Sequence, residues 1–148
     1  MRTTGVTRTV VPVMKASRAA FASLTVNGVQ GTNQVAATAT LGIGVTGALS
    51  LSSSNLGAAW DLGYAAVPLL PASAGGLMTG GGQIINLDFA DPSFGTWFNF
   101  LATSPPFVSL AVPFAIPVST AISAQFGIAD PSLPDGLALS QPTRLLVQ

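Results

Sequence analysis

The chain has 148 residues, which is enough for one compact domain with a sizeable core, and it contains no His, Cys or Glu. Five Lys or Arg residues balance five Asp residues, so the net charge is zero, and only 7% of the sequence is charged where globular proteins average about 25%. This composition excludes a disulfide framework, argues against nucleic-acid binding, and removes the side chains that carry most acid–base catalysis near neutral pH, so we expect a non-enzymatic protein with no cofactor.

The first 30 residues differ from the rest of the chain in charge and in texture. Four of the five basic residues, from Arg2 to Arg18, lie here, whereas every Asp comes later. We predict an extended, β-prone arm over residues 1–30 that either forms the first hairpin of the domain or adds a strand to the sheet of a neighbouring molecule. The second alternative places the contact with a neighbouring subunit at Arg8, Val10, Val11, Val13 and Lys15.

From residue 31 to residue 148, apolar residues alternate with polar or small ones, and Gly or Pro interrupts the pattern about every ten residues. The longest run, Val35 to Val45, predicts a strand with one buried face. This pattern is typical of an all-β domain, and we predict an antiparallel β-sandwich of about eight strands, of the jelly-roll or immunoglobulin-like type. Shorter runs predict strands at Leu49–Leu51, Trp60–Tyr64, Gln83–Phe89, Phe107–Phe114, Ile122–Ile128 and Leu145–Val147.

Turns rich in Gly and Pro separate the predicted strands. Asn27-Gly28 fits a type I′ hairpin turn, whose two central residues both need positive φ, and Pro134-Asp135-Gly136 marks another turn. Residues 72–82 contain five Gly and predict a mobile loop; no Lys-Ser or Lys-Thr pair follows, so a phosphate-binding loop is the weaker interpretation. The most apolar stretch, Phe107 to Val118, is interrupted by two Pro residues and is too short to span a bilayer, so we expect no membrane span.

Paired carboxylates are the remaining arrangement that could act as a catalyst, and Asp88 with Asp91, or Asp130 with Asp135, would suit glycoside hydrolysis. The sequence favours turns instead, because Asp-Pro and Asp-Gly pairs place carboxylates where they accept local backbone N–H bonds. A Ca²⁺ site, which needs about six to eight oxygen ligands, is a weaker candidate, with Asn86, Asp88 and Asp91 as its cluster. We expect no catalytic residue and no metal.

Trp60, Tyr64 and Trp97 are candidates for a sugar-stacking platform. Aromatic faces pack against the apolar faces of sugar rings, and the surrounding Asn, Gln and Asp side chains could bind the hydroxyl groups of extracellular glycans. Trp residues more often serve as the core of a sandwich, and we favour that interpretation.

The C-terminal part of the chain carries four sequence blocks: residues 112–117 (VPFAIP), 122–126 (ISAQF), 129–131 (ADP) and 136–140 (GLALS). In these blocks the chain resembles a family of uncharacterised secreted β-sandwich domains of planctomycetes and similar environmental bacteria. The resemblance is closest toward the C-terminus and looser from residue 31 onward, and the chain lacks the cysteines common in that family. It implies a sandwich fold and an extracellular or cell-surface location, and it supplies no catalytic residues.

These features predict a structural role, as a self-assembling subunit of a filament or surface layer whose partners are copies of the same chain, joined through the N-terminal arm. A neutral, charge-poor surface offers little resistance to close packing, and head-to-tail contacts generate open polymers. The alternative is a carbohydrate-binding or adhesion module that uses exposed aromatic residues, and a hydrolase ranks behind both.

Overall fold

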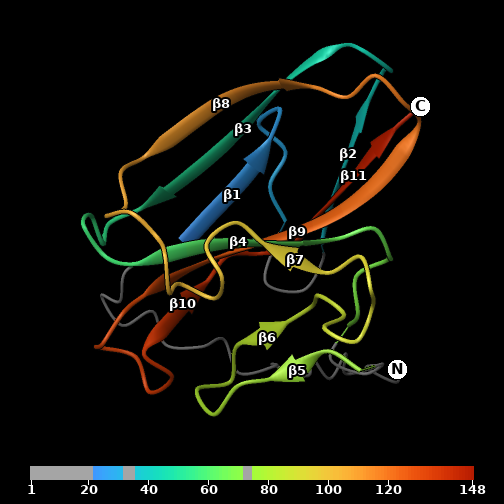
Figure 1. Cartoon of the computed structure of the whole chain (residues 1–148). Coiled ribbons are helices and arrows are strands. Elements are labelled where there is room, and N and C mark those ends of the chain that lie inside the picture. Colours follow the sequence, from blue (N-terminus) through green and yellow to red (C-terminus); the bar gives the residue numbers. More distant parts are fainter. Residues whose placement is uncertain (1–21, 32–35, 72–74) are drawn as a thin grey trace, which may run out of the picture.

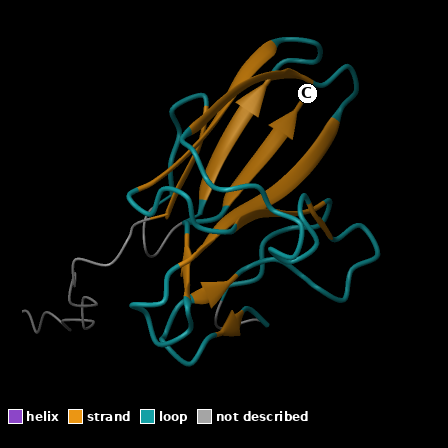
Figure 2. Cartoon of the chain, turned by 60° about the vertical axis from the view of Figure 1, so that its left-hand side comes forward, coloured by secondary structure: helices purple, strands orange, loops and turns teal. Residues whose placement is uncertain are grey.

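The computed structural model of this chain describes residues 22–31, 36–71 and 75–148, and within them it contains strands and loops but no helix (Figure 2). The predicted all-β class is confirmed. Three of the eleven strands have only two residues, so eight strands have three residues or more, which agrees with the predicted number. In chain order the strands are β1 (Ala22–Val26), β2 (Ala37–Leu41), β3 (Thr46–Ser53), β4 (Trp60–Ala65), β5 (Leu77–Met78), β6 (Ile84–Ile85), β7 (Gly95–Thr96), β8 (Leu110–Ala115), β9 (Thr120–Ala129), β10 (Leu137–Leu139) and β11 (Thr143–Val147).

Two sheets face each other and form the sandwich (Figure 1). The small sheet has the order β1-β3-β8 and is antiparallel, and the large sheet has the order β2-β11-β9-β4-β7. The long strand β9 pairs with β4 along one edge, while β11 and β10 share its other edge. β2 and β11 pair in parallel, which corrects the prediction of a purely antiparallel sandwich. They are far apart in sequence, so no short hairpin turn forces them to run in opposite directions.

The core lies between the two sheets and is filled by the alternating residues of their inner faces. Leu24 and Leu51 come from the small sheet. Trp60, Phe126 and Ile128 come from the large sheet, and all five side chains are at most 5% exposed. Full burial of such a side chain contributes about 1.5–3 kcal/mol to folding. A second cluster closes the sandwich between the small sheet and the β2–β11 pair, and it consists of Val26, Ala39, Leu41, Leu145 and Val147.

The strand predicted from Val35 to Val45 is interrupted in the structure. A turn at residues 42–45 separates β2 from β3 and carries the chain from the large sheet to the small one. Gly44 has a φ of 71°, a left-handed conformation that Gly adopts without steric cost. The apolar alternation continues through this turn, but Ile43 and Val45 are 51% and 52% exposed. The first residue of the predicted run lies outside the described residues.

A third layer of chain, residues 83–94, crosses the outer face of the large sheet, on the side away from the small sheet, before the chain joins the edge of that sheet as β7. Its start is held by the side-chain amide of Gln125 in β9, which donates to the Ile84 carbonyl (2.8 Å) and accepts from the Asn86 N–H (2.9 Å). The side-chain amide thus acts as the peptide group of a neighbouring strand would. The strand predicted over Gln83–Phe89 is therefore reduced to the two residues of β6.

The Gly-rich segment predicted as a mobile loop forms, over its described residues 75–82, the greater part of a small hairpin in which β5 pairs with β6. Its turn is fixed to the segment between β9 and β10. Asp135 in that segment accepts hydrogen bonds from the Thr79 hydroxyl and the Gly81 N–H, both at 2.6 Å. Asp135, which is distant in sequence, therefore orders a Gly-rich segment whose composition alone predicts a mobile loop.

β1 belongs to the sandwich rather than to a separate arm. It pairs with β3 along its whole length, and Leu24 is completely buried. Asn27 and Gly28 follow with φ of 50° and 74°, as the predicted type I′ turn requires. The boundary predicted at residue 30 therefore falls after the first strand of the sandwich. Residues 1–21 lie outside the described residues, and so do the predicted subunit contacts Arg8, Val10, Val11, Val13 and Lys15.

Candidate functional site

The three predicted sugar-stacking residues lie on one face of the large sheet, near its β4–β7 edge. Trp60 is 5% exposed, and its ring centroid lies 4.8 Å from that of Phe98 in the core. Trp97 contacts the Trp60 ring edge-on at 6.1 Å. Because Tyr64 and Trp97 are 38% and 43% exposed, these two rings, and not Trp60, are accessible from outside.

The three residues of the predicted oxygen cluster each bind a nearby part of the chain. Asp88 accepts from the Ala90 N–H (2.9 Å), and the Asn86 amide donates to a backbone carbonyl (2.8 Å). Asp91 accepts from the hydroxyl and the N–H of Ser93, and these hydrogen bonds lower the pKa of its carboxyl. Among the residues that the structure describes, no three His, Cys, Asp or Glu side chains are placed to hold a metal ion.

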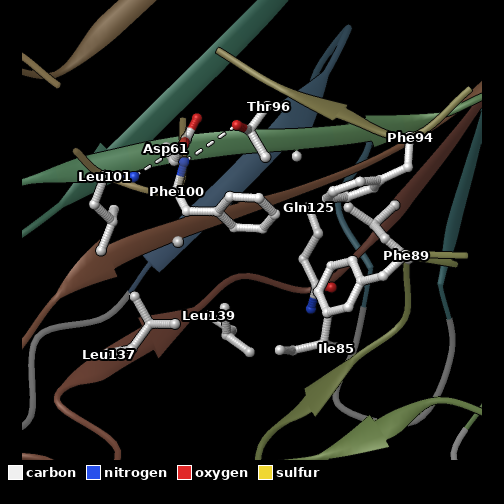
Figure 3. Close-up of a pocket in the computed structure, with 13 residues that line it drawn as sticks. Asp61, Ile85, Phe89, Phe94, Thr96, Phe100, Leu101, Gln125, Leu137 and Leu139 are labelled. Carbon is white, nitrogen blue, oxygen red and sulfur yellow. Dashed lines mark hydrogen bonds between the residues drawn. The ribbon is translucent and has the colours of Figure 1, made fainter. Parts of the chain in front are cut away.

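An open pocket of about 160 Å³ lies between the outer face of the large sheet and the third layer (Figure 3). Gly63, Gln125 and Gly127 of β4 and β9 form its floor. Phe89 and Phe100, which are 45% and 64% exposed, lie at its rim. Its remaining walls are mainly apolar and come from Ile85, Leu87, Phe94, Leu101, Leu137 and Leu139.

Asp61 of β4 positions one side of this pocket, and the residue is only 7% exposed. One carboxylate oxygen accepts from the N–H groups of Leu62 (2.8 Å) and Phe98 (2.9 Å), and the other accepts from the Leu101 N–H (3.1 Å). Residues 99–101 all have positive φ, from 50° to 73°. This conformation is costly for residues other than Gly, so the carboxylate holds a turn that the local sequence does not favour.

Sequence reasoning missed the pocket because its residues come from strands and loops that share no periodic pattern. Asp61 was assigned no role, since a single Asp inside a predicted strand fits no motif. One signal was present: four of the eight Phe residues fall between Phe89 and Phe100, in a segment that contains only the two-residue strand β7. Such a density of aromatic residues outside long strands points to a cluster of rings over a sheet face.

Exposed apolar side chains gather at the two ends of the antiparallel β3–β8 pair. At one end, the Gly44 N–H donates to the Ile116 carbonyl (2.8 Å) and joins the turn before β3 to the turn after β8. At the other end, the Gly57 N–H donates to the Phe107 carbonyl (2.9 Å) and joins the turn after β3 to the segment before β8. We call the first group, Ile43, Val45 and Val118, the head patch. We call the second group, Leu56 and Val108, the tail patch. All five side chains are 51–65% exposed.

The head and tail patches are separated by the length of β3, which is about 26 Å for its eight residues. The two patches differ in composition, and they lie at opposite ends of the β3–β8 pair.

Comparison of the chain with protein-family models, with curated proteins and with solved structures gives no match. Within residues 22–31, 36–71 and 75–148, no helix is long and apolar enough to cross a membrane. Function therefore has to be inferred from the residues of this chain alone.

Proposed function

We propose that this chain is a non-enzymatic extracellular structural protein whose copies associate head to tail into a filament or surface layer. The observation that carries the proposal is the pair of unlike apolar patches at opposite ends of the β3–β8 pair. When the head patch of one copy covers the tail patch of the next, the growing chain keeps one free patch at each of its two ends. Contacts of this kind produce open polymers when the rotation between copies does not close a ring.

Charge supports the same arrangement. Residues 22–148 contain five Asp and one Arg, which gives a net charge of −4, whereas residues 1–21 contain four basic residues and no acidic ones, which gives +4. A cationic segment of one copy therefore complements the acidic body of another. Because the whole molecule is neutral, copies meet with little net repulsion.

The use of the Asp side chains supports a non-enzymatic role. Each of the five accepts at least one backbone N–H within the described residues, and the N–H donors belong to Leu62, Ala90, Ser93, Ser132 and Gly81. These carboxylates shape turns and loops. The extracellular location is supported by the resemblance of the C-terminal blocks to secreted sandwich domains.

Single substitutions at the two patches test the proposal. Wild-type protein at neutral pH should form large particles in sedimentation velocity and filaments or sheets in electron microscopy. Ile43→Asp in the head patch and Val108→Asp in the tail patch should each leave a monomer, because a charge would be buried without a partner in the contact. Both positions are more than half exposed in the single molecule, so each variant should stay folded. A monodisperse wild-type monomer would overturn the proposal.

Leu77→Asp is the matched control. Leu77 in β5 is 54% exposed and belongs to neither patch. The same loss of an apolar side chain and gain of a charge should leave assembly unchanged there.

Removal of residues 1–21 tests the contribution of the cationic segment. The truncation ends before β1, because a longer deletion would remove Leu24 from the core. Assembly should become weaker, and added salt should now strengthen it where it weakens wild-type assembly, because the truncated copies each carry a net charge of −4 and repel one another until salt screens that charge. Assembly that is unchanged by the truncation would restrict the contact to the two patches.

A second candidate, a carbohydrate-binding or adhesion module, is favoured by the partly exposed rings of Tyr64 and Trp97 on one sheet face. Stacking of a sugar on Trp97 should quench the fluorescence of the wild type, and Trp97→Ala should abolish the glycan-dependent change while the buried Trp60 remains. The absence of any response to a panel of extracellular glycans would remove this candidate.

A further inference from the structure

The polar groups around the pocket on the outer face of the large sheet are already hydrogen-bonded within the chain. Asp61 accepts from three N–H groups. The Gln125 amide accepts from the Asn86 N–H and donates to the Ile84 and Ser140 carbonyls. A charged or strongly polar group would therefore lose its hydration on entering without gaining equivalent partners. The part of an occupant that enters the pocket must be uncharged and apolar.

The volume of the pocket accommodates one small ring. Its volume of about 160 Å³ is close to that of an engineered apolar cavity of about 150 Å³ that binds benzene. A fused or branched molecule of larger size would have to leave much of its surface in solvent.

The arrangement of the wall residues favours an aromatic ring over an aliphatic one. The ring centroids of Phe89 and Phe94 are 4.8 Å apart with an interplanar angle of 69°, and that of Phe100 lies 5.8 Å from that of Phe94. In Figure 3, Phe94 and Phe89 lie on one side of the Phe100 ring, with Ile85 next to Phe89, and Leu137 and Leu139 lie on the other side. A bound ring could therefore meet either an edge or a face of these Phe rings. Aromatic pairs in such orientations contribute more binding free energy than the burial of their apolar surface alone.

The pocket is also preformed. A Cβ at Gly63 would lie 2.7 Å from a methyl carbon of Leu87, so the absence of a side chain there lets the third layer lie close to the floor. Asp61 holds Leu101, and with it the rim residue Phe100, through the turn of positive φ. A site that is already shaped loses less free energy on ordering when a ligand binds.

We propose that this pocket binds a small uncharged molecule, or the uncharged end of a larger one, through a single six-membered aromatic ring. The site is separate from the head and tail patches and does not depend on assembly.

The test uses toluene as the probe, with methylcyclohexane and benzoate as controls for aromaticity and charge. Methyl NMR spectra are recorded on the Ile43→Asp chain, so that self-association cannot obscure the result. Toluene should cause saturable shifts in the methyl signals of Leu87, Leu137 and Leu139. Methylcyclohexane should bind roughly tenfold more weakly because it lacks the ring–ring contacts, and benzoate should cause no saturable shift at these methyl groups.

Leu139→Phe fills the pocket with a ring of its own and should reduce toluene affinity by roughly tenfold or more. Leu77→Phe adds the same ring at an exposed position outside the pocket and should leave binding unchanged. Three results would overturn the proposal: no saturable shift with toluene on the unsubstituted pocket, equal shifts at methyl groups remote from the pocket, or equal affinity for methylcyclohexane. All three are measured without any pocket variant, so a Leu139→Phe chain that fails to fold leaves the test intact.

Discussion

At the scale of single residues, Asp61 determines the course of the segment that follows β7. Its carboxylate accepts hydrogen bonds from the backbone N–H groups of Leu62, Phe98 and Leu101. These hydrogen bonds hold the turn in which three consecutive residues have positive φ. A buried group of this kind has a large effect on stability when it is altered, because the N–H groups that it binds are left without a partner.

Asp61→Asn should lower the free energy of unfolding by about 1.5–3 kcal/mol, since the amide nitrogen would face a backbone N–H where an oxygen now accepts. Asp88→Asn is the control; Asp88 accepts one N–H in an exposed turn, and its amide keeps an oxygen for that bond. Urea denaturation of both variants measures the difference. Equal midpoints for the two variants would contradict the role given to Asp61.

Thr143 in β11 is 1% exposed, and its hydroxyl has no hydrogen-bond partner among the described residues. Thr143→Val keeps the shape of the side chain and removes a hydroxyl that folding dehydrates. The variant should be as stable as the wild type or more stable by about 1 kcal/mol. A clear loss of stability on thermal unfolding would show that the hydroxyl makes a contact of value.

Asp135 fixes the β5–β6 hairpin, and its carboxyl has a lowered pKa. The hydrogen bond from the Thr79 hydroxyl is the main cause. Burial raises the pKa, and hydrogen bonds from Gly81 and Gln83 lower it further. A carboxyl with a lowered pKa stabilises the folded state above its ordinary pKa of 3.8, and this stabilisation is lost as the pH falls through the folded value. The hairpin should therefore be fixed at neutral pH and loosen in acid below pH 3.8.

Hydrogen exchange at the Gly81 amide, corrected for the intrinsic effect of pH, measures this loosening. Protection should fall as the pH is lowered below 3.8 in the wild type, and it should be low at every pH in Asp135→Ala, which has no side-chain acceptor for the Gly81 N–H. Protection that does not change in acid would contradict the assignment.

At the scale of elements, two glutamine side chains connect the third layer to the large sheet. Gln125 binds Ile84 and Asn86 of the third layer, and Gln83 binds β10 in the same way by donating to the Leu137 carbonyl (2.6 Å) and accepting from the Leu139 N–H (2.8 Å). Each amide supplies one donor and one acceptor, as a peptide group of a neighbouring strand would.

Gln125→Leu should therefore lower stability by about 2–4 kcal/mol, because three backbone groups lose their partner inside the protein. Gln30→Leu is the control, since Gln30 makes an exposed hydrogen bond to Ser23 and should change stability by less than about 0.5 kcal/mol. Chemical denaturation would contradict the bridging role if both substitutions had the same small effect.

Alternation predicted the strands that have one face in the core and failed where burial has another cause. In β9, Phe126 and Ile128 face the core as the pattern predicts, but Ser123 and Gln125 on the other face are also buried. The segment after β4 covers Ser123, whose hydroxyl donates to the Val67 carbonyl, and the third layer covers Gln125. That layer has no periodicity, so no local pattern could reveal it. Between Val35 and Val45 the reverse occurred: apolar alternation continued through a turn, where exposed Ile43 and Val45 belong to the head patch.

At the scale of the whole molecule, the sandwich is an acidic body with an apolar patch at either end and an aromatic pocket on the outer face of its large sheet (Figure 3). The all-β class and the strand count followed from the sequence, because they depend on local alternation and turn chemistry. The two patches and the pocket did not, because each joins residues that only the topology brings together.

Mixing the two patch variants tests head-to-tail association most directly. Ile43→Asp retains a working tail patch, and Val108→Asp retains a working head patch. Each variant alone should sediment as a monomer. An equal mixture should form dimers and nothing larger, because each dimer presents only blocked patches at its outer ends. A mixture that stays monomeric, or one that regains the large particles of the wild type, would contradict the association of head with tail.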